Sequence, residues 1–186
     1  MAVHETIDDG IAILTMDNPP VNALNITDAY FIAEKISSYS KREDGIKVIL
    51  LRSSGNGFCA GVDIKEIQEL PENEGILKAN HSCYELFDAI HSSKIPVIAS
   101  VKGHCLGTGI GIVGSVDVII ASQEATFGLP EVDNGALGAA SHLMRLVPAQ
   151  RARWMLYTCE TATSQELFNY GSVLEVVEME KLEEAS

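Results

Sequence analysis

Three short and almost uninterrupted apolar segments divide this chain of 186 residues: IKVILLRS (46–53), IPVIASVKG (95–103) and DVIIAS (117–122). Apolar runs of this length without alternation are typical of strands that are buried on both faces, as in a parallel sheet. The segments 63–70 and 75–92, which lie between them, have the apolar spacing of helices. Strands that alternate with helices predict βαβ units with right-handed crossovers, so the predicted fold class is α/β.

The remaining segments extend this pattern without dividing the chain. Residues 3–16 alternate around Asp9-Gly10, which predicts a β-hairpin, and residues 25–42 have helical spacing. Beyond residue 127 the pattern is mostly helical, and the acid-rich end 175–186 is expected to begin a solvated helix. The sequence contains no linker, repeat or low-complexity stretch, and its length suits one core, so we predict a single domain over residues 1–186.

Charge and cysteine content narrow the class of partner. The formal net charge is −13, which argues against nucleic acid or an anionic membrane as a partner. No apolar run reaches the ~20 residues of a membrane span, and no signal segment opens the chain. The four cysteines form neither a C-x-x-C pair nor a zinc spacing. We therefore expect reduced, mostly buried thiols, no metal site and a cytoplasmic protein.

The segment GHCLGTGIGIVGSVD (103–117) contains the pattern G-x-G-x-x-G at Gly109, Gly111 and Gly114. A dinucleotide-binding turn closes the first strand of its domain and is followed by an acid at the end of the next strand. Neither condition holds here, so no dinucleotide cofactor is predicted. Two interpretations remain: backbone N–H groups at a helix start that stabilise an oxyanion, or glycines that allow close helix packing.

A second strand-to-helix loop, GNGFCAGVDIKE (55–66), favours the oxyanion interpretation, because two such loops can aim their N–H groups at one oxygen. At this point the sequence resembles the crotonase superfamily, the enoyl-CoA hydratases and isomerases. FCAGVDIKE, NPPVNAL (18–24), the strand-loop-helix from residue 95 to 122 and ATFGLPEV (125–132) match four of its motifs in order, over about residues 3–177.

The resemblance implies a crotonase-like ββα spiral (the ClpP/crotonase fold) that here lacks the usual C-terminal helical part. It implies an acyl-CoA substrate, no cofactor beyond the coenzyme A moiety of that substrate, and a homotrimer or hexamer. Val62 N–H and Thr108 N–H would form the oxyanion hole for the thioester carbonyl. The residues implied to line the coenzyme A channel are Val21, Ala23, Leu24, Ala60, Gly61, Asp63, Ile64 and Gly107.

One position departs from the hydratases of this family, which resemble one another in having two glutamates. The second is present as Glu131, but Gly111 occupies the position of the first. Paired carboxylates divide the work of hydration, since one activates water and the other delivers a proton. One carboxylate beside an oxyanion hole suffices for double-bond isomerisation or for hydrolysis of a C–C bond next to a ketone. Burial is expected to raise the pKa of Glu131.

The stretch GLPEVDNGALGAASHLMRLVP (128–148), together with NPPVNAL and GVDIKE, most resembles crotonase-fold hydrolases that open rings in bacterial steroid breakdown. These act on a CoA thioester that carries a cyclic β-diketone. His142 is a tentative second titrating group; its alternative is a helix residue packed in the core. Trp154 and Tyr157, in a helical stretch, are expected in the core.

Alternatives from other classes stay open on the sequence alone. They are a Δ3-Δ2 enoyl-CoA isomerase, a hydratase with an atypical second acid, a non-catalytic relative that binds coenzyme A or RNA, and an enzyme acting on carrier-bound substrates in polyketide assembly. The negative charge argues against RNA and against an acidic acyl carrier.

Overall fold

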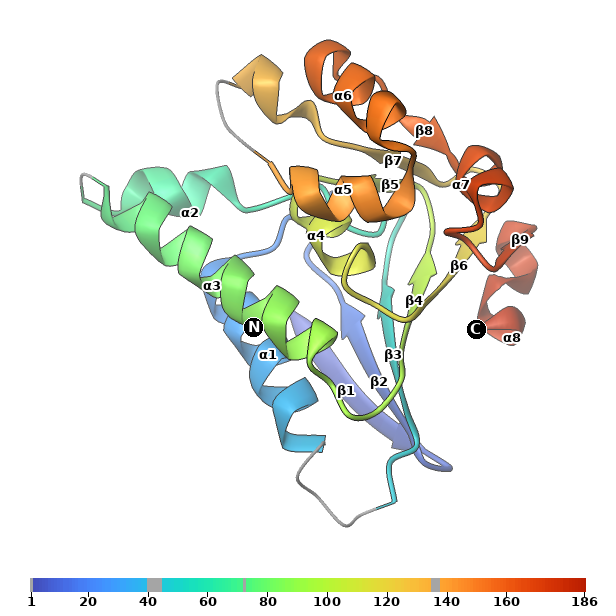
Figure 1. Ribbon diagram of the computed structural model, residues 1–186. Helices are drawn as coiled ribbons and strands as arrows, with labels where there is room; N and C mark the ends of the chain where they lie inside the picture. The colour runs from blue at the N-terminus through green and yellow to red at the C-terminus, as the bar shows by residue number, and fades with distance from the viewer. Residues whose placement is uncertain (1, 40–44, 72, 135–137) are drawn as a thin grey trace.

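The computed structural model describes residues 2–39, 45–71, 73–134 and 138–186, and two sheets organise them (Figure 1). The larger sheet has the order β1-β2-β3-β4-β6-β9, and the smaller one has the order β5-β7-β8. The strands of the larger sheet are β1 (Val3–Asp8), β2 (Ile11–Met16), β3 (Val48–Ser53), β4 (Val97–Val101), β6 (Val118–Ser122) and β9 (Glu175–Val177). Those of the smaller sheet are β5 (His104–Leu106), β7 (Thr126–Gly128) and β8 (Ala162–Thr163).

Hydrophobic patterning explains the larger sheet. The hairpin of β1 and β2 is antiparallel, whereas β2, β3, β4, β6 and β9 pair in parallel. Strand β2, between β1 and β3, alternates between buried and less buried residues, which is typical of a strand with one covered face, while β3 is buried along most of its length. The predicted hairpin and the three predicted buried strands are therefore confirmed.

Eight helices accompany the strands in the described part of the chain. They are α1 (Ile26–Tyr39), α2 (Ile64–Glu69), α3 (Glu74–His91), α4 (Thr108–Val113), α5 (Ala140–Leu146), α6 (Ala149–Thr158), α7 (Ser164–Tyr170) and α8 (Leu182–Ala185). Two 3₁₀ turns, η1 (Pro130–Asn134) and η2 (Met179–Lys181), complete the elements. Helices α1 and α3 run side by side along one flank of the larger sheet, and α4 lies beneath α5 (Figure 1).

The chain repeats one unit: a strand in the larger sheet, a strand in the smaller sheet, then a helix. Strands β4 and β5 lead into α4, and β6 and β7 lead into η1 and α5. In the preceding unit β3 leads to Cys59, which forms an isolated parallel bridge with Cys105 of β5, and then to α2. This is the ββα spiral that the sequence predicted.

The C-terminal region differs from the expectation. Residues Glu175–Val177 form β9, a parallel strand beside β6, rather than the start of a solvated helix. Without β9, this edge of β6 would leave backbone N–H and C=O groups unpaired. Pairing with Glu175–Val177 satisfies those groups, and this gain outweighs the local acidity of the segment. Trp154 and Tyr157 were also predicted wrongly, since they are 53% and 78% exposed on α6. The face of α6 that packs inward instead carries Ala152 and Met155.

The cysteine prediction is confirmed: all four thiols are free, with Cys59 and Cys105 fully buried and the other two partly so. Burial raises the pKa of the Cys59 thiol to about 12, so this thiol is neutral and packs as a small apolar group. Among the described residues, no helix is both long and apolar enough to cross a bilayer. The described part of the chain also holds no cluster of three or more His, Cys, Asp or Glu side chains that would suit a metal ion.

Candidate active site

The register of the smaller sheet brings three predicted site residues together. Cys59 pairs with Cys105, and Cys105 pairs with Phe127 of β7. Val62 and Thr108 each lie three residues beyond their paired cysteine, and Glu131 lies four residues beyond Phe127. All three therefore occupy the exit from the smaller sheet in consecutive turns of the spiral.

Val62 presents its amide to this point because of the way its loop is held. Leu24 N–H donates to Gly61 O, and Asp63 N–H donates to Leu24 O, at 2.8 and 3.0 Å. In this parallel bridge Gly61 O and Asp63 N–H both face Leu24. The Val62 N–H belongs to the same trans peptide group as Gly61 O, so it points away from Leu24. Within the described part of the chain, the Val62 N–H donates to no acceptor. It is free to donate to a ligand.

Thr108 presents the second amide at the start of α4. The preceding residue, Gly107, has φ +57° and ψ −115°, a conformation that is essentially limited to glycine. A β-carbon on Gly61 would lie 3.9 Å from Thr108 N, so the two loops are in contact. Thr108 N–H also lacks an acceptor among the residues described. The two loops thus bring two amides without described acceptors close together, at the start of α4, and their role as an oxyanion hole stays a prediction.

The Glu131 carboxyl lies directly against this pair of loops. A β-carbon on Gly107 would be 3.1 Å from Glu131 Oε1, and one on Gly138 would be 2.6 Å from the same oxygen. Glycine at both positions leaves the space that the carboxyl fills. Glu131 Oε2 is shielded from solvent and has no hydrogen-bond partner among the described residues. Burial raises the pKa of Glu131, partly offset by a hydrogen bond from its own backbone.

A buried carboxyl with an unpaired oxygen is costly unless a ligand completes its hydrogen bonds. The carboxyl lies beside two amides that also lack described acceptors, so a ligand bound here could complete the hydrogen bonds of all three groups. A carboxyl so placed has the chemistry to accept a proton from water and to return it.

An aromatic ring packs against Gly111, the position at which the resemblance to hydratases would imply a glutamate. A β-carbon on Gly111 would overlap the ring atoms Cζ, Cε1 and Cε2 of Phe87. The Phe87 ring in turn packs against the His142 ring, with centroids 4.8 Å apart. The sequence predicted only that Phe87 lies in a helix, within the segment 75–92, and the structure shows that its ring fills this position.

His142, on α5, packs near Gly114 at the end of α4, whereas Glu131, on η1, packs near Gly107 at its start. A β-carbon on Gly114 would be 2.6 Å from His142 Cβ, and burial, with Arg145 and His91 nearby, lowers the pKa of His142. No hydrogen bond joins His142 to Glu131 in the described residues. Its catalytic role stays a prediction, and its packing on α4 fits the alternative interpretation.

Of the two purposes that the sequence left open for the glycines of the 103–117 stretch, close packing is confirmed, and the oxyanion role stays a prediction. Gly107 has a backbone conformation that favours glycine, and Gly109 allows contact with Cys59 and Cys105. Gly111 admits the ring of Phe87, and Gly114 admits the Cβ and backbone oxygen of His142.

The residues predicted to line the coenzyme A channel come from two loops that contact each other. Asn22 Nδ2 donates to Ser54 O and Gly57 O, each at 2.7 Å, and Ala60 N–H donates to Asn22 O. His104 packs over Gly57 and contacts Val21 O at 2.9 Å through Nε2, so it points away from the oxyanion amides. The predicted channel residues on these loops are Val21, Ala23, Leu24, Ala60, Gly61, Asp63 and Ile64.

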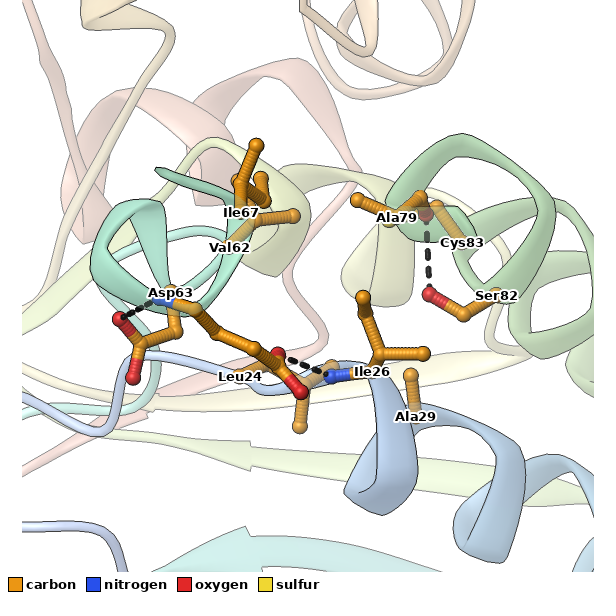
Figure 2. Close-up of a pocket in the computed structure, with 10 residues that line it drawn as sticks. Leu24, Ile26, Ala29, Val62, Asp63, Ile67, Ala79, Ser82 and Cys83 are labelled. Carbon is orange, nitrogen blue, oxygen red and sulfur yellow. Dashed lines mark hydrogen bonds between the residues drawn. The ribbon is translucent and has the colours of Figure 1, made fainter. Parts of the chain in front are cut away.

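A pocket lies beside Val62, between α1, α2 and α3 (Figure 2). Val62 and Ile67 line one side, and Ala79 and Cys83 of α3 line the other. Asp63 caps α2 by accepting from Lys65 N–H at 3.0 Å, and Ile26 N–H donates to Glu66 Oε2 at 2.8 Å. The gap admits no water molecule in this conformation, so an acyl group there would have to push α2 and α3 apart.

Asp133 follows Glu131 on η1 and is exposed. Of the 128–148 stretch that supported the ring-opening hypothesis, residues 135–137 lie outside the described residues, as does the side chain of Asn134.

Comparison with known proteins gives a consistent result. The family model described as enoyl-CoA hydratase/isomerase matches residues 6–186. A (7aS)-7a-methyl-1,5-dioxo-2,3,5,6,7,7a-hexahydro-1H-indene-carboxyl-CoA hydrolase of Rhodococcus jostii is 46% identical over 187 residues, covering 100% of this chain and 72% of that protein. The hydrolase of the same name from Mycobacterium tuberculosis is 45% identical over 97% of this chain and 73% of its own length. The crystal structure of an enoyl-CoA hydratase from Mycobacterium smegmatis superposes with a TM-score of 0.93 at 28% identity, covering 100% of this chain and 73% of that one.

Proposed function

Because the chain belongs to the enoyl-CoA hydratase/isomerase family, we propose that it hydrolyses a ring C–C bond in a CoA thioester that carries a cyclic β-diketone. The observation that carries the proposal is the Glu131 carboxyl, whose Oε2 is shielded from solvent, beside two amides that lack acceptors among the described residues, with an aromatic ring where a second acid would stand. The relatives from Rhodococcus jostii and Mycobacterium tuberculosis are named as hydrolases of a bicyclic dioxo carboxyl-CoA, which supports the broader class of CoA thioesters that carry a cyclic diketone.

The proposed reaction begins with the thioester carbonyl bound by Val62 N–H and Thr108 N–H. Glu131 takes a proton from water, whose oxygen attacks the ring ketone. The bond between that ketone carbon and the neighbouring ring carbon breaks, and its electron pair becomes an enolate that is conjugated with the held thioester carbonyl, given that the thioester is attached to that ring carbon. Glu131 then returns the proton to this carbon, and the former ketone carbon stays in the opened product as a carboxylic acid. The two amides stabilise the enolate more than the neutral thioester, and that difference is what accelerates the reaction.

Several finer assignments belong to the same proposal. No cofactor is needed beyond the coenzyme A moiety of the substrate, which the 18–24 and 59–64 loops would hold. The active form would be a homotrimer or hexamer in the cytoplasm. Isomerisation of a 3-enoyl-CoA also needs only one carboxylate and is the second candidate, supported by the same single Glu131.

The test compares turnover of a cyclic β-diketone CoA thioester by the wild type, Glu131→Gln and Asp133→Asn. Glu131→Gln keeps the size of the side chain but cannot accept a proton, so we expect a loss of about 10²–10⁴-fold in kcat. Asp133→Asn removes an exposed carboxylate two residues away and should leave kcat unchanged. The product is identified by NMR as a new carboxylic acid, because mass alone does not distinguish hydration from ring opening. Rapid 3-enoyl-CoA isomerisation without ring opening would replace the first candidate by the second.

A further inference from the structure

The Phe87 ring fills the space beside residue 111, the position at which a second acid would stand. Its ring covers Gly111, one helical turn after the Gly107–Thr108 oxyanion turn. One turn earlier on α3, Cys83 Sγ lies 3.8 Å from Thr108 Oγ1, and Cys83 lines the pocket beside Val62. Helix α3 therefore runs along α4 with one face toward the site, and Phe87 is on that face.

The ring has little freedom to leave this position. Gly111 lies on one side of it and the His142 ring on the other, 4.8 Å away between centroids. His142 is itself held with its Cβ close to Gly114. A side chain at residue 111 would thus have to displace two packed rings, at a cost of the order of overpacking a core.

We infer that Phe87 is a specificity-determining residue, which closes the second acid position of the site and so restricts the enzyme to chemistry that one carboxylate can perform. This inference rests on the proposed function and deepens it. Hydration of a 2-enoyl thioester needs water oxygen to reach C3 while a proton reaches C2. An apolar ring over Gly111 leaves no second polar group to hold that water, whereas proton transfer by Glu131 alone is unaffected.

The test removes the ring and restores the acid. Four proteins are compared: the wild type, Phe87→Ala, Gly111→Glu, and the double variant with both changes. Hydration of crotonyl-CoA is followed as loss of the enoyl ultraviolet band. We expect only the double variant to gain hydration, by about 10²-fold or more over the wild type, the scale of one general acid–base group. Adding Glu131→Gln to the double variant should abolish the gain.

A stability measurement tests the same steric argument if the glutamate variant folds poorly. Gly111→Ala adds one methyl group beside the ring and should lower Tm by about 2–12 °C. In the Phe87→Ala background the same methyl group should cost little, because the ring is gone. Equal costs in the two backgrounds would show that Phe87 does not close the position.

The remaining outcomes separate this inference from the proposed function. An equal gain of hydration in the Gly111→Glu single variant, or a folded double variant that binds acyl-CoA without any gain, would overturn the role of Phe87. Ring opening by the wild type would still support the proposed function in that case. A gain in the double variant, with no ring opening by the wild type, would support Phe87 and reject the proposed substrate.

Discussion

Two successive turns of one short helix differ in what rests on their glycines. At Gly107 a buried carboxyl lies against the backbone, beside two amides that donate to no described residue. At Gly111 an aromatic ring lies against the backbone, supported by a second ring. The first turn needs glycine for its backbone conformation, and the second needs it for volume. On the proposed function, reaction chemistry belongs to the first turn, and the inferred exclusion of a second acid belongs to the next.

Among the glycine substitutions at these two turns, the largest expected effect comes from Gly107→Ala. The φ of +57° is strained for alanine, and the methyl group would press on Gly61 and Glu131, so the Thr108 amide should shift. We expect kcat for ring opening to fall by about 10²–10³-fold, the scale of losing one oxyanion donor. Gly171→Ala is the matched control, because Gly171 has φ +83° with no atom within 4 Å of the added methyl group. Similar losses of kcat in both variants would show that the Gly107 turn has no special role.

The second prediction concerns the pH dependence of the same turn. Glu131 acts as a base only when ionised, and burial raises its pKa above the ordinary value of 4.5. Activity should therefore rise with pH through the raised pKa, so the acidic limb of kcat/KM lies above that of an exposed glutamate. The profile is measured with a substrate that does not titrate in this range. An acidic limb at or below the ordinary value would contradict the assigned base.

A third prediction separates stability from activity. With a folded-state pKa above the unfolded one, ionised Glu131 opposes folding at pH values above both, and this cost disappears as pH falls below the unfolded value. Glu131→Gln should therefore raise Tm at pH 8, although it removes activity, and the gain should vanish near pH 4. Asp133→Asn provides the control for loss of a carboxylate. A lower Tm for Glu131→Gln at pH 8 would mean that the carboxyl has a partner that stabilises it.

The smallest effect is expected at the Gly111 turn. Burial is the main reason that the pKa of His142 is lowered from 6.5, and the Phe87 ring provides part of that burial. Phe87→Ala should raise the pKa of His142 toward its ordinary value, as followed by NMR of the imidazole protons. Phe31→Leu, on α1, is the control and should leave it unchanged. An unchanged pKa of His142 in Phe87→Ala would mean that the Phe87 ring does not shield the imidazole from solvent.

The sequence predicted the α/β class well because its main strands carry their signal locally, whereas the spiral was implied by the family resemblance. The runs at β3, β4 and β6 are apolar enough to be recognised alone, and Asp9-Gly10 marks its hairpin. The short strands β5, β7, β8 and β9 were missed, because two or three residues carry no period and their pairing is decided by distant partners. Those same short strands set the register that aligns Val62, Thr108 and Glu131.

The candidate site divides in a similar way. Glu131 and the two loops could be placed by their motifs, and Gly111 revealed the absent acid. Phe87 could not be assigned to the site, because a phenylalanine at helical spacing has the same pattern whether it packs in a core or covers a glycine on another helix. Gly138 was missed for the same reason, since its contact with Glu131 depends on how α5 folds back.

The most direct test of the central claim is a side-by-side measurement of kcat/KM for the wild type with two substrates. One is a CoA thioester carrying a cyclic β-diketone, and the other is crotonyl-CoA. A site with one carboxylate and a closed second position predicts ring opening that exceeds hydration by about 10²-fold or more. Hydration of crotonyl-CoA at an equal or greater rate would show that a second acid operates, and would contradict the account given for Glu131, Gly111 and Phe87.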